Sequence, residues 1–197
     1  MASACNHTIM KAPETSRHFT RWKNPSNDVE SLILTTRVAP VQQSFYYTHP
    51  SFTDDGRFLW LGCGYPPEGG KHALQVLGVV DFERDEIRVY PETQFPTARP
   101  VIDFTTGEVY WGNHLDIWKR GPHSGDRAVR VNSFPKELAV GKLVRLATHP
   151  AFSADHRFLS IDALFTQPDG RQVCYIGDLP LDGSPFRLWQ RFENLTY

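Results

Sequence analysis

The chain has 197 residues with 21 Lys and Arg against 22 Asp and Glu, and its net charge of −1 excludes the basic character that favours nucleic acid or an anionic membrane. Hydrophobic residues make up 40% and aromatic residues 13%, which is enough for a buried core and excludes a fibrous or wholly disordered chain. The first residues lack the continuous apolar segment of a signal peptide, and no stretch is long enough to span a membrane, so we expect a cytoplasmic protein.

Residues 1–30 are polar and contain Pro13, Pro25 and a cluster of Ser, Asn and Asp, which predicts a weakly ordered lead-in. The next segment, residues 31–38, is rich in Leu, Ile, Thr and Val and predicts a β-strand. No segment shows a helical period of 3.6 residues over three turns. We assign residues 31–197 to one β-rich domain.

A repeated motif runs through this domain. The segment Thr48–Leu59 (THPSFTDDGRFL) returns 100 residues later as Thr148–Leu159 (THPAFSADHRFL), and a degenerate copy, Arg99–Tyr110, lies halfway, so the period is 50 residues. Each copy places a polar turn between two short strands, and Gly56 supplies the positive φ that such turns need. His156 replaces this Gly in the last copy, so we expect a different or mildly strained turn there. A repeat of this length and pattern predicts a β-propeller blade.

We therefore predict an all-β fold, a partial β-propeller of about three four-stranded blades at residues 41–91, 92–140 and 141–191. The innermost strands are expected near residues 48–53, 100–104 and 148–153. The strand at 31–38 has the place of an outermost blade strand, and we expect it to be orphaned or to pack as a substitute edge. Propellers close with about four to eight blades, so three blades leave an incomplete ring. Either the chain is part of a longer protein, or several copies complete the ring through their open edges, or blades were lost.

Candidate site residues lie in the loops that lead into the innermost strands and in the loops that join the second and third strands of a blade. The catalytic candidates are His49, His149 and Tyr47, and the substrate-binding candidates are Arg99, His114, Asn113 and Lys71. An imidazole titrates near neutral pH and transfers protons, and Arg holds a carboxylate through two hydrogen bonds. The alternative is structural: a His before Pro bonds only to nearby backbone, and His114 and His156 serve in turns.

Other chemistry finds little support in the sequence. It lacks a Gly-x-Ser-x-Gly elbow, a Cys-x-x-Cys pair, a phosphate-binding Gly loop and a His-Glu-x-x-His motif. His49 and His149 without a third ligand are weak evidence for a metal site, so we expect no metal and no cofactor in this chain. Cys63 and Cys174 fall inside predicted strands, and we expect them to be buried free thiols.

Three segments carry a resemblance to a known family: Leu32–Thr36 (LILTT), Phe45–Arg57 (FYYTHPSFTDDGR) and His149–Ser153 (HPAFS). They resemble the N-terminal blades of seven-bladed β-propeller polysaccharide lyases of the oligogalacturonate lyase and ulvan lyase type. The resemblance covers about residues 30–195, roughly the first half of such an enzyme. Similar Phe-Ser/Thr-x-Asp-Gly-Arg turns also occur in propellers that only bind.

The resemblance implies a carbon–oxygen lyase that cleaves uronate-containing oligosaccharides by β-elimination, with an acidic oligosaccharide as ligand. A base removes the C5 proton, an acid assists the departing O4, and a positive group neutralises the C6 carboxylate. His49, His149 and Tyr47 match positions for base and acid. The divalent metal of the oligogalacturonate branch, Mn²⁺, is held by His and Gln of later blades, beyond Tyr197, so we expect weak or no turnover. The alternative is a non-catalytic propeller module that binds protein or glycan.

Overall fold

The computed structural model describes residues 13–45, 48–65, 74–95 and 100–193, and within these ranges the protein is all-β. The described residues contain no α-helix, as predicted, and a single 3₁₀ turn, η1 (Pro13–Thr15). In the same ranges no helix has the length and apolar character needed to cross a membrane.

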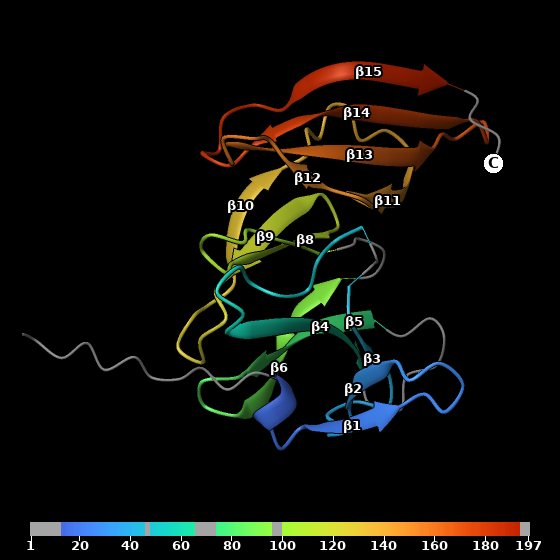
Figure 1. Cartoon of the computed structure of the whole chain (residues 1–197). Coiled ribbons are helices and arrows are strands. Elements are labelled where there is room, and N and C mark those ends of the chain that lie inside the picture. The colour runs from blue at the N-terminus through green and yellow to red at the C-terminus, as the bar shows by residue number, and fades with distance from the viewer. Residues whose placement is uncertain (1–12, 46–47, 66–73, 96–99, 194–197) are drawn as a thin grey trace, which may run out of the picture.

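The strands form four antiparallel sheets, and no sheet closes on itself within the described residues (Figure 1). The hairpin sheet contains β1 (Phe19–Lys23) and β2 (Glu30–Leu34). The first sheet contains, in spatial order, β3 (Gln42–Gln43), β4 (Phe58–Tyr65), β5 (Leu74–Asp81) and β6 (Glu86–Phe95). The second sheet contains β7 (Val101–Ile102), β8 (Val109–Asn113), β9 (Asp116–Arg120) and β10 (Val129–Ser133). The third sheet contains β11 (Lys142–Leu146), β12 (Ala151–Phe152), β13 (Phe158–Thr166), β14 (Gln172–Pro180) and β15 (Arg187–Glu193).

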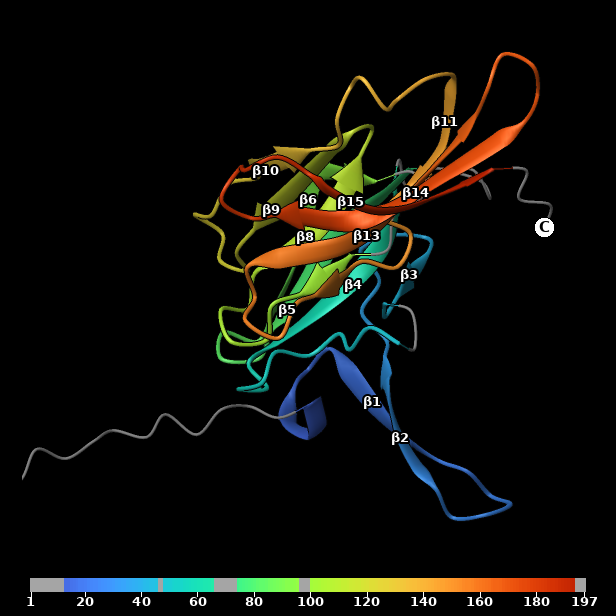
Figure 2. The same ribbon diagram turned by 90° about the horizontal axis from the view of Figure 1, so that it is seen from above.

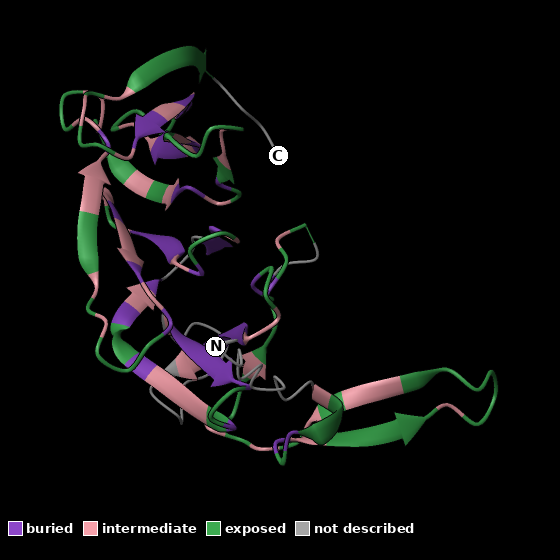
Figure 3. Ribbon diagram, turned by 60° about the vertical axis from the view of Figure 1, so that its left-hand side comes forward, coloured by how far each residue is buried: buried purple, intermediate pink, exposed green. Residues whose placement is uncertain are grey.

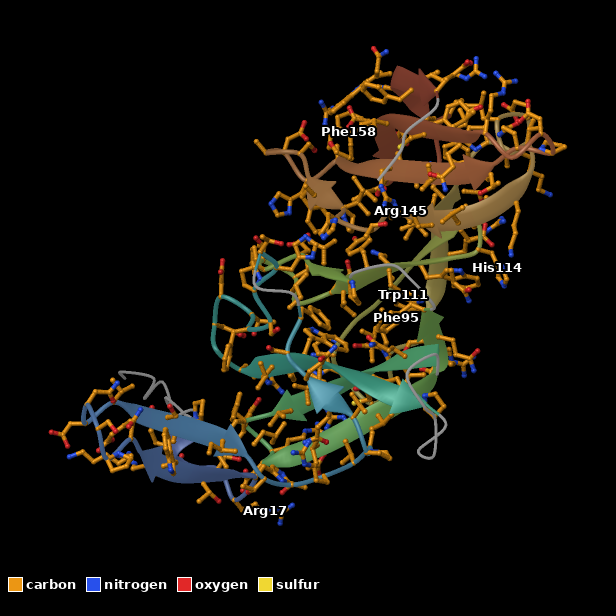
Figure 4. All side chains as sticks on the ribbon, turned by 90° about the vertical axis from the view of Figure 1, so that its right-hand side faces the viewer. Arg17, Phe95, Trp111, His114, Arg145 and Phe158 are labelled. Carbon is orange, nitrogen blue, oxygen red and sulfur yellow. The ribbon has the colours of Figure 1, made fainter. Side chains whose placement is uncertain are left out.

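The sheets stack in chain order, and three clusters of apolar side chains fill the spaces between them. Successive side chains of a strand point to opposite faces of its sheet, so one strand can contribute side chains to the apolar clusters on both faces. Trp60 packs toward the second sheet with Phe95 and Trp111 (Figure 4), whereas Leu59 packs toward the hairpin sheet. Ile161 of β13 packs against the other face of the second sheet.

The repeated turns share one backbone conformation. Gly56, Gly107 and His156 have φ values of 66°, 72° and 55°, so all three are left-handed. A residue with a Cβ pays about 1 kcal/mol for this conformation, which gives the last copy the mild strain that the sequence predicted. The hydroxyls of Thr53 and Ser153 each accept a hydrogen bond from a backbone N–H later in their turn.

The innermost strands predicted at 48–53 and 148–153 are interrupted, which corrects the prediction. In the first sheet, β3 pairs with Gly62 and Cys63, and among the described residues that follow, the chain rejoins β4 at the bridge from Phe52 to Leu59. In the third sheet, β11 and β12 pair with separate parts of β13. Pro50 and Pro150 have no N–H to donate to a sheet, which is one physical reason for the break before each short strand.

The strand predicted at 31–38 also differs from expectation. β2 does not take the place of a blade edge but pairs with β1, a strand within the segment expected to be weakly ordered. The hairpin sheet extends away from the other sheets (Figure 2). Its base covers the outer face of the first sheet, where Phe19 and Leu34 pack against the buried cluster around Leu59. The hairpin sheet therefore covers one end of the stack.

The far face of the third sheet carries polar side chains. Along β13, side chains point alternately toward the second sheet and away from it. On the face that points away, Asp162 pairs with Arg145 Nε at 2.9 Å, and the Ser160 hydroxyl donates a hydrogen bond to Asp178 at 2.9 Å. Every residue of β15 is exposed (Figure 3), and 59% of the Trp189 surface is accessible. This end keeps an uncovered edge strand.

Candidate functional site

The two equivalent histidines of the repeat come together in space. The ring centroids of His49 and His149 lie 6.2 Å apart at an interplanar angle of 62°. Each lies where the innermost strand of its sheet is interrupted, His49 between β3 and Phe52 and His149 between β11 and β12. His49 is half-buried and His149 is exposed. Both histidines therefore lie in loop segments rather than inside a strand.

Polar groups hold each interruption in shape. In the first sheet, the Ser51 hydroxyl accepts a hydrogen bond from Phe45 N at 2.8 Å. In the third sheet, the Asp162 carboxylate accepts from Thr148 N at 2.8 Å and from Arg145 Nε at 2.9 Å. Ala147, directly before, has a left-handed φ of 50°. The backbone next to His149 is therefore fixed by charge-assisted bonds to the neighbouring strand.

Both imidazoles line a pocket of about 560 Å³ between the starts of the three motif copies. Its walls come from all three copies, and they consist of Thr48, His49, Pro50, Val101, Ile102, Phe104, His149, Pro150, Ala151, Phe152, Ser153, Ala154 and His156. Apolar walls with a few polar side chains are typical of ligand sites. Aromatic rings, aliphatic side chains and imidazoles thus face one space.

His156 belongs to this pocket, although the sequence suggested only a turn role. Its Nδ1 lies 3.3 Å from Asp103 Oδ2, and its ring stacks on Phe152 with centroids 5.1 Å apart. The backbone N–H groups of Thr105 and Thr106 donate to Asp103 Oδ1. The signal in the sequence was the replacement of Gly by His at the left-handed position of the motif.

The other predicted site residues lie elsewhere or outside the described ranges. Tyr47, Arg99 and Lys71 fall outside the described residues. Asn113 lines a separate pocket of about 430 Å³, next to the cross-strand pair Trp111 and Trp118. His114 is exposed in the turn between β8 and β9, with φ of 51° (Figure 4). Neither residue lines the pocket of His49 and His149.

Among the described residues, no three His, Cys, Asp or Glu side chains gather closely enough to hold a metal ion. Cys63 and Cys174 are buried free thiols, as predicted. Burial raises the pKa of the Cys63 thiol to about 11, which makes it a poor nucleophile at neutral pH. Among the described residues that line the pocket, the imidazoles of His49, His149 and His156 are the side chains suited to proton transfer near neutral pH.

No protein family model matches this sequence, and none of the curated proteins is similar to it.

Proposed function

We propose that the first, second and third sheets are consecutive blades of a β-propeller. Three observations support the proposal: the sheets follow one another at the 50-residue period of the motif, each is a meander of antiparallel strands, and they stack face to face. The innermost segments, β7, β12 and the residues around Phe52, would then line the inner wall of the ring. The pocket of His49 and His149 would open on that wall.

We propose further that this pocket binds a uronate-containing oligosaccharide and that the protein is related in function to polysaccharide lyases. The observation that carries the proposal is the pairing of His49 and His149, with ring centroids 6.2 Å apart in a pocket with apolar walls. Side chains such as Val101 and Phe104 suit the apolar face of a sugar ring. Two imidazoles beside that ring suit transfer of two protons.

β-Elimination requires both transfers. One imidazole takes the C5 proton, the electron pair left on C5 forms the C4–C5 double bond, and the C4–O4 bond breaks. The departing O4 then receives a proton from the second imidazole or from Tyr47. A cation has to neutralise the C6 carboxylate so that the C5 proton becomes acidic, and Arg99 is our candidate. Tyr47 and Arg99 lie outside the described residues, so their roles rest on the sequence: Tyr47 directly precedes the first motif copy and Arg99 begins the second.

A second candidate function is a non-catalytic module that binds glycan or protein. It is favoured by the partly buried position of His49 against His149, because packed imidazoles also serve structural roles. In that case the histidines hold the inner strands together and transfer no proton.

His149→Ala separates the two functions, with His123→Ala as the control because His123 is exposed and does not line the pocket. Binding of trigalacturonate is measured by calorimetry, turnover by the ultraviolet absorbance of the unsaturated product, and stability by urea unfolding. We expect His149→Ala to lose binding and any weak turnover at unchanged stability. A wild-type chain that binds no uronide overturns the proposal. A loss of about 1–3 kcal/mol of stability with binding unchanged supports the structural role instead.

A further inference from the structure

The last copy of the motif departs from the other two at one position. Gly56 and Gly107 occupy the left-handed position of their turns at no steric cost, whereas His156 adopts the same conformation with a side chain. An added Cβ at Gly56 would meet no atom within 4 Å, so the turn leaves room for a side chain. Strained backbone of this kind is found preferentially at functional sites, and here the strained residue lines the pocket.

The surroundings of His156 determine which ring nitrogen is available. Nδ1 lies 3.3 Å from Asp103 Oδ2, which favours the tautomer with the proton on Nδ1. The ring is held by its stack on Phe152, which is in turn in edge contact with Tyr110 at 5.2 Å. In this tautomer Nε2 carries a lone pair and acts as a hydrogen-bond acceptor.

We propose that His156, oriented by Asp103, is a ligand-binding residue of the pocket whose Nε2 accepts a hydrogen bond from a hydroxyl group of a bound sugar. The inference rests on the proposed function and adds a third imidazole to it, together with a requirement for a polyhydroxy ligand. The competing interpretation is that the contact between His156 and Asp103 only joins the second and third sheets.

Two substitutions in the pocket and one control test this proposal. His156→Gly installs the residue that the other two copies carry, so the turn keeps its conformation and loses only the imidazole. Asp103→Asn keeps an oxygen for Thr105 N and Thr106 N but places an NH₂ group beside Nδ1, which favours the tautomer with the proton on Nε2. Asp28→Gly is the control, because Asp28 is an exposed left-handed residue in the turn of the hairpin sheet.

Binding of trigalacturonate is measured by calorimetry at mildly alkaline pH, where an ordinary imidazole is neutral. Imidazole ¹⁵N NMR reports the tautomer, and thermal unfolding reports the fold. We expect both pocket variants to bind about tenfold more weakly, the effect of one lost hydrogen bond. Asp103→Asn should move the His156 proton to Nε2. His156→Gly and Asp28→Gly should melt no lower than the wild type.

The outcomes separate this inference from the proposed function. If the wild type binds trigalacturonate and His156→Gly binds it equally well, the inference is wrong and the proposed function remains. The same holds if His156→Gly binds normally but melts lower, since the pair then only joins the sheets. If the wild type itself binds no uronide, the proposed function fails and this inference fails with it.

Discussion

The indole Nε1 of Trp60 donates a hydrogen bond of 3.1 Å to the backbone oxygen of Gly107 and so joins the first sheet to the repeated turn of the second sheet. Trp60 is fully buried, and it packs in the cluster that separates these sheets. Trp60 directly follows the first motif copy, so the contact links neighbouring repeats of the sequence. The interface between the first and second sheets therefore contains an oriented hydrogen bond as well as apolar contacts.

Trp60→Phe should destabilise the fold by about 1–3 kcal/mol, because it leaves the buried oxygen of Gly107 without its donor and opens a small cavity. Urea unfolding measures the change. Trp189→Phe is the matched control, since 59% of the Trp189 surface is accessible, and it should change the stability by less than about 0.5 kcal/mol. Equal effects for the two variants would show that the indole bond contributes nothing.

His18 should hold the hairpin sheet in place. Its ring is buried, with Nε2 2.9 Å from the backbone oxygen of Asp85 and Nδ1 3.0 Å from the Thr36 hydroxyl. His18→Ala leaves the buried backbone oxygen of Asp85 and the partly buried Thr36 hydroxyl without this partner. The strands β1 and β2 should therefore exchange their amide hydrogens faster while the three large sheets stay protected. Arg17→Ala is the control because 71% of that side chain is exposed. The prediction is contradicted if His18→Ala, like Arg17→Ala, leaves amide hydrogen exchange in β1 and β2 no faster than in the wild type.

The stability of the fold should fall as the pH rises from about 9 to about 11. Burial raises the pKa of Cys63 from 9.0 to about 11, so the folded state keeps a proton that the unfolded chain has lost in this range. The free energy of unfolding should fall by about 2–3 kcal/mol over this range. Cys63→Ala should remove this part of the decline in urea unfolding midpoints. The pKa of Tyr110 is also raised, by burial and by Glu108, so some decline should remain at higher pH. A wild-type curve that is flat over this range would refute the assignment.

Self-association should use the end of the stack that carries β15. The other end is covered by the hairpin sheet, whereas β15 exposes Trp189, Leu188 and Phe192, and no strand of the described residues pairs with its outer edge. We expect light scattering after size exclusion to show oligomers that Trp189→Lys disperses. Trp22→Lys, on the exposed part of the hairpin sheet, should leave them intact. A wild-type chain that stays monomeric at high concentration would contradict both this prediction and the partial ring.

The sequence by itself determined the features that depend on local chemistry and on the repeat. The all-β fold follows from short apolar segments between polar turns, and the left-handed turns follow from Gly56 and its equivalents. The equivalence of His49 and His149 could also be seen, because a 50-residue period places equal residues at equal points of successive units. Burial of Cys63 and Cys174 followed from their place inside strands.

Only the tertiary structure decided which distant residues meet. β1 has no alternating apolar pattern and is held by His18, whose partner Asp85 lies 67 positions away. Asp103 and His156 meet only because the second sheet packs against the third. The breaks beside Pro50 and Pro150 depend on how each strand pairs along its neighbour. The first two features arise from contacts between separate sheets, whose energies no local pattern of residues encodes, and the packing of the second sheet against the third brings His156 to the pocket of His49 and His149.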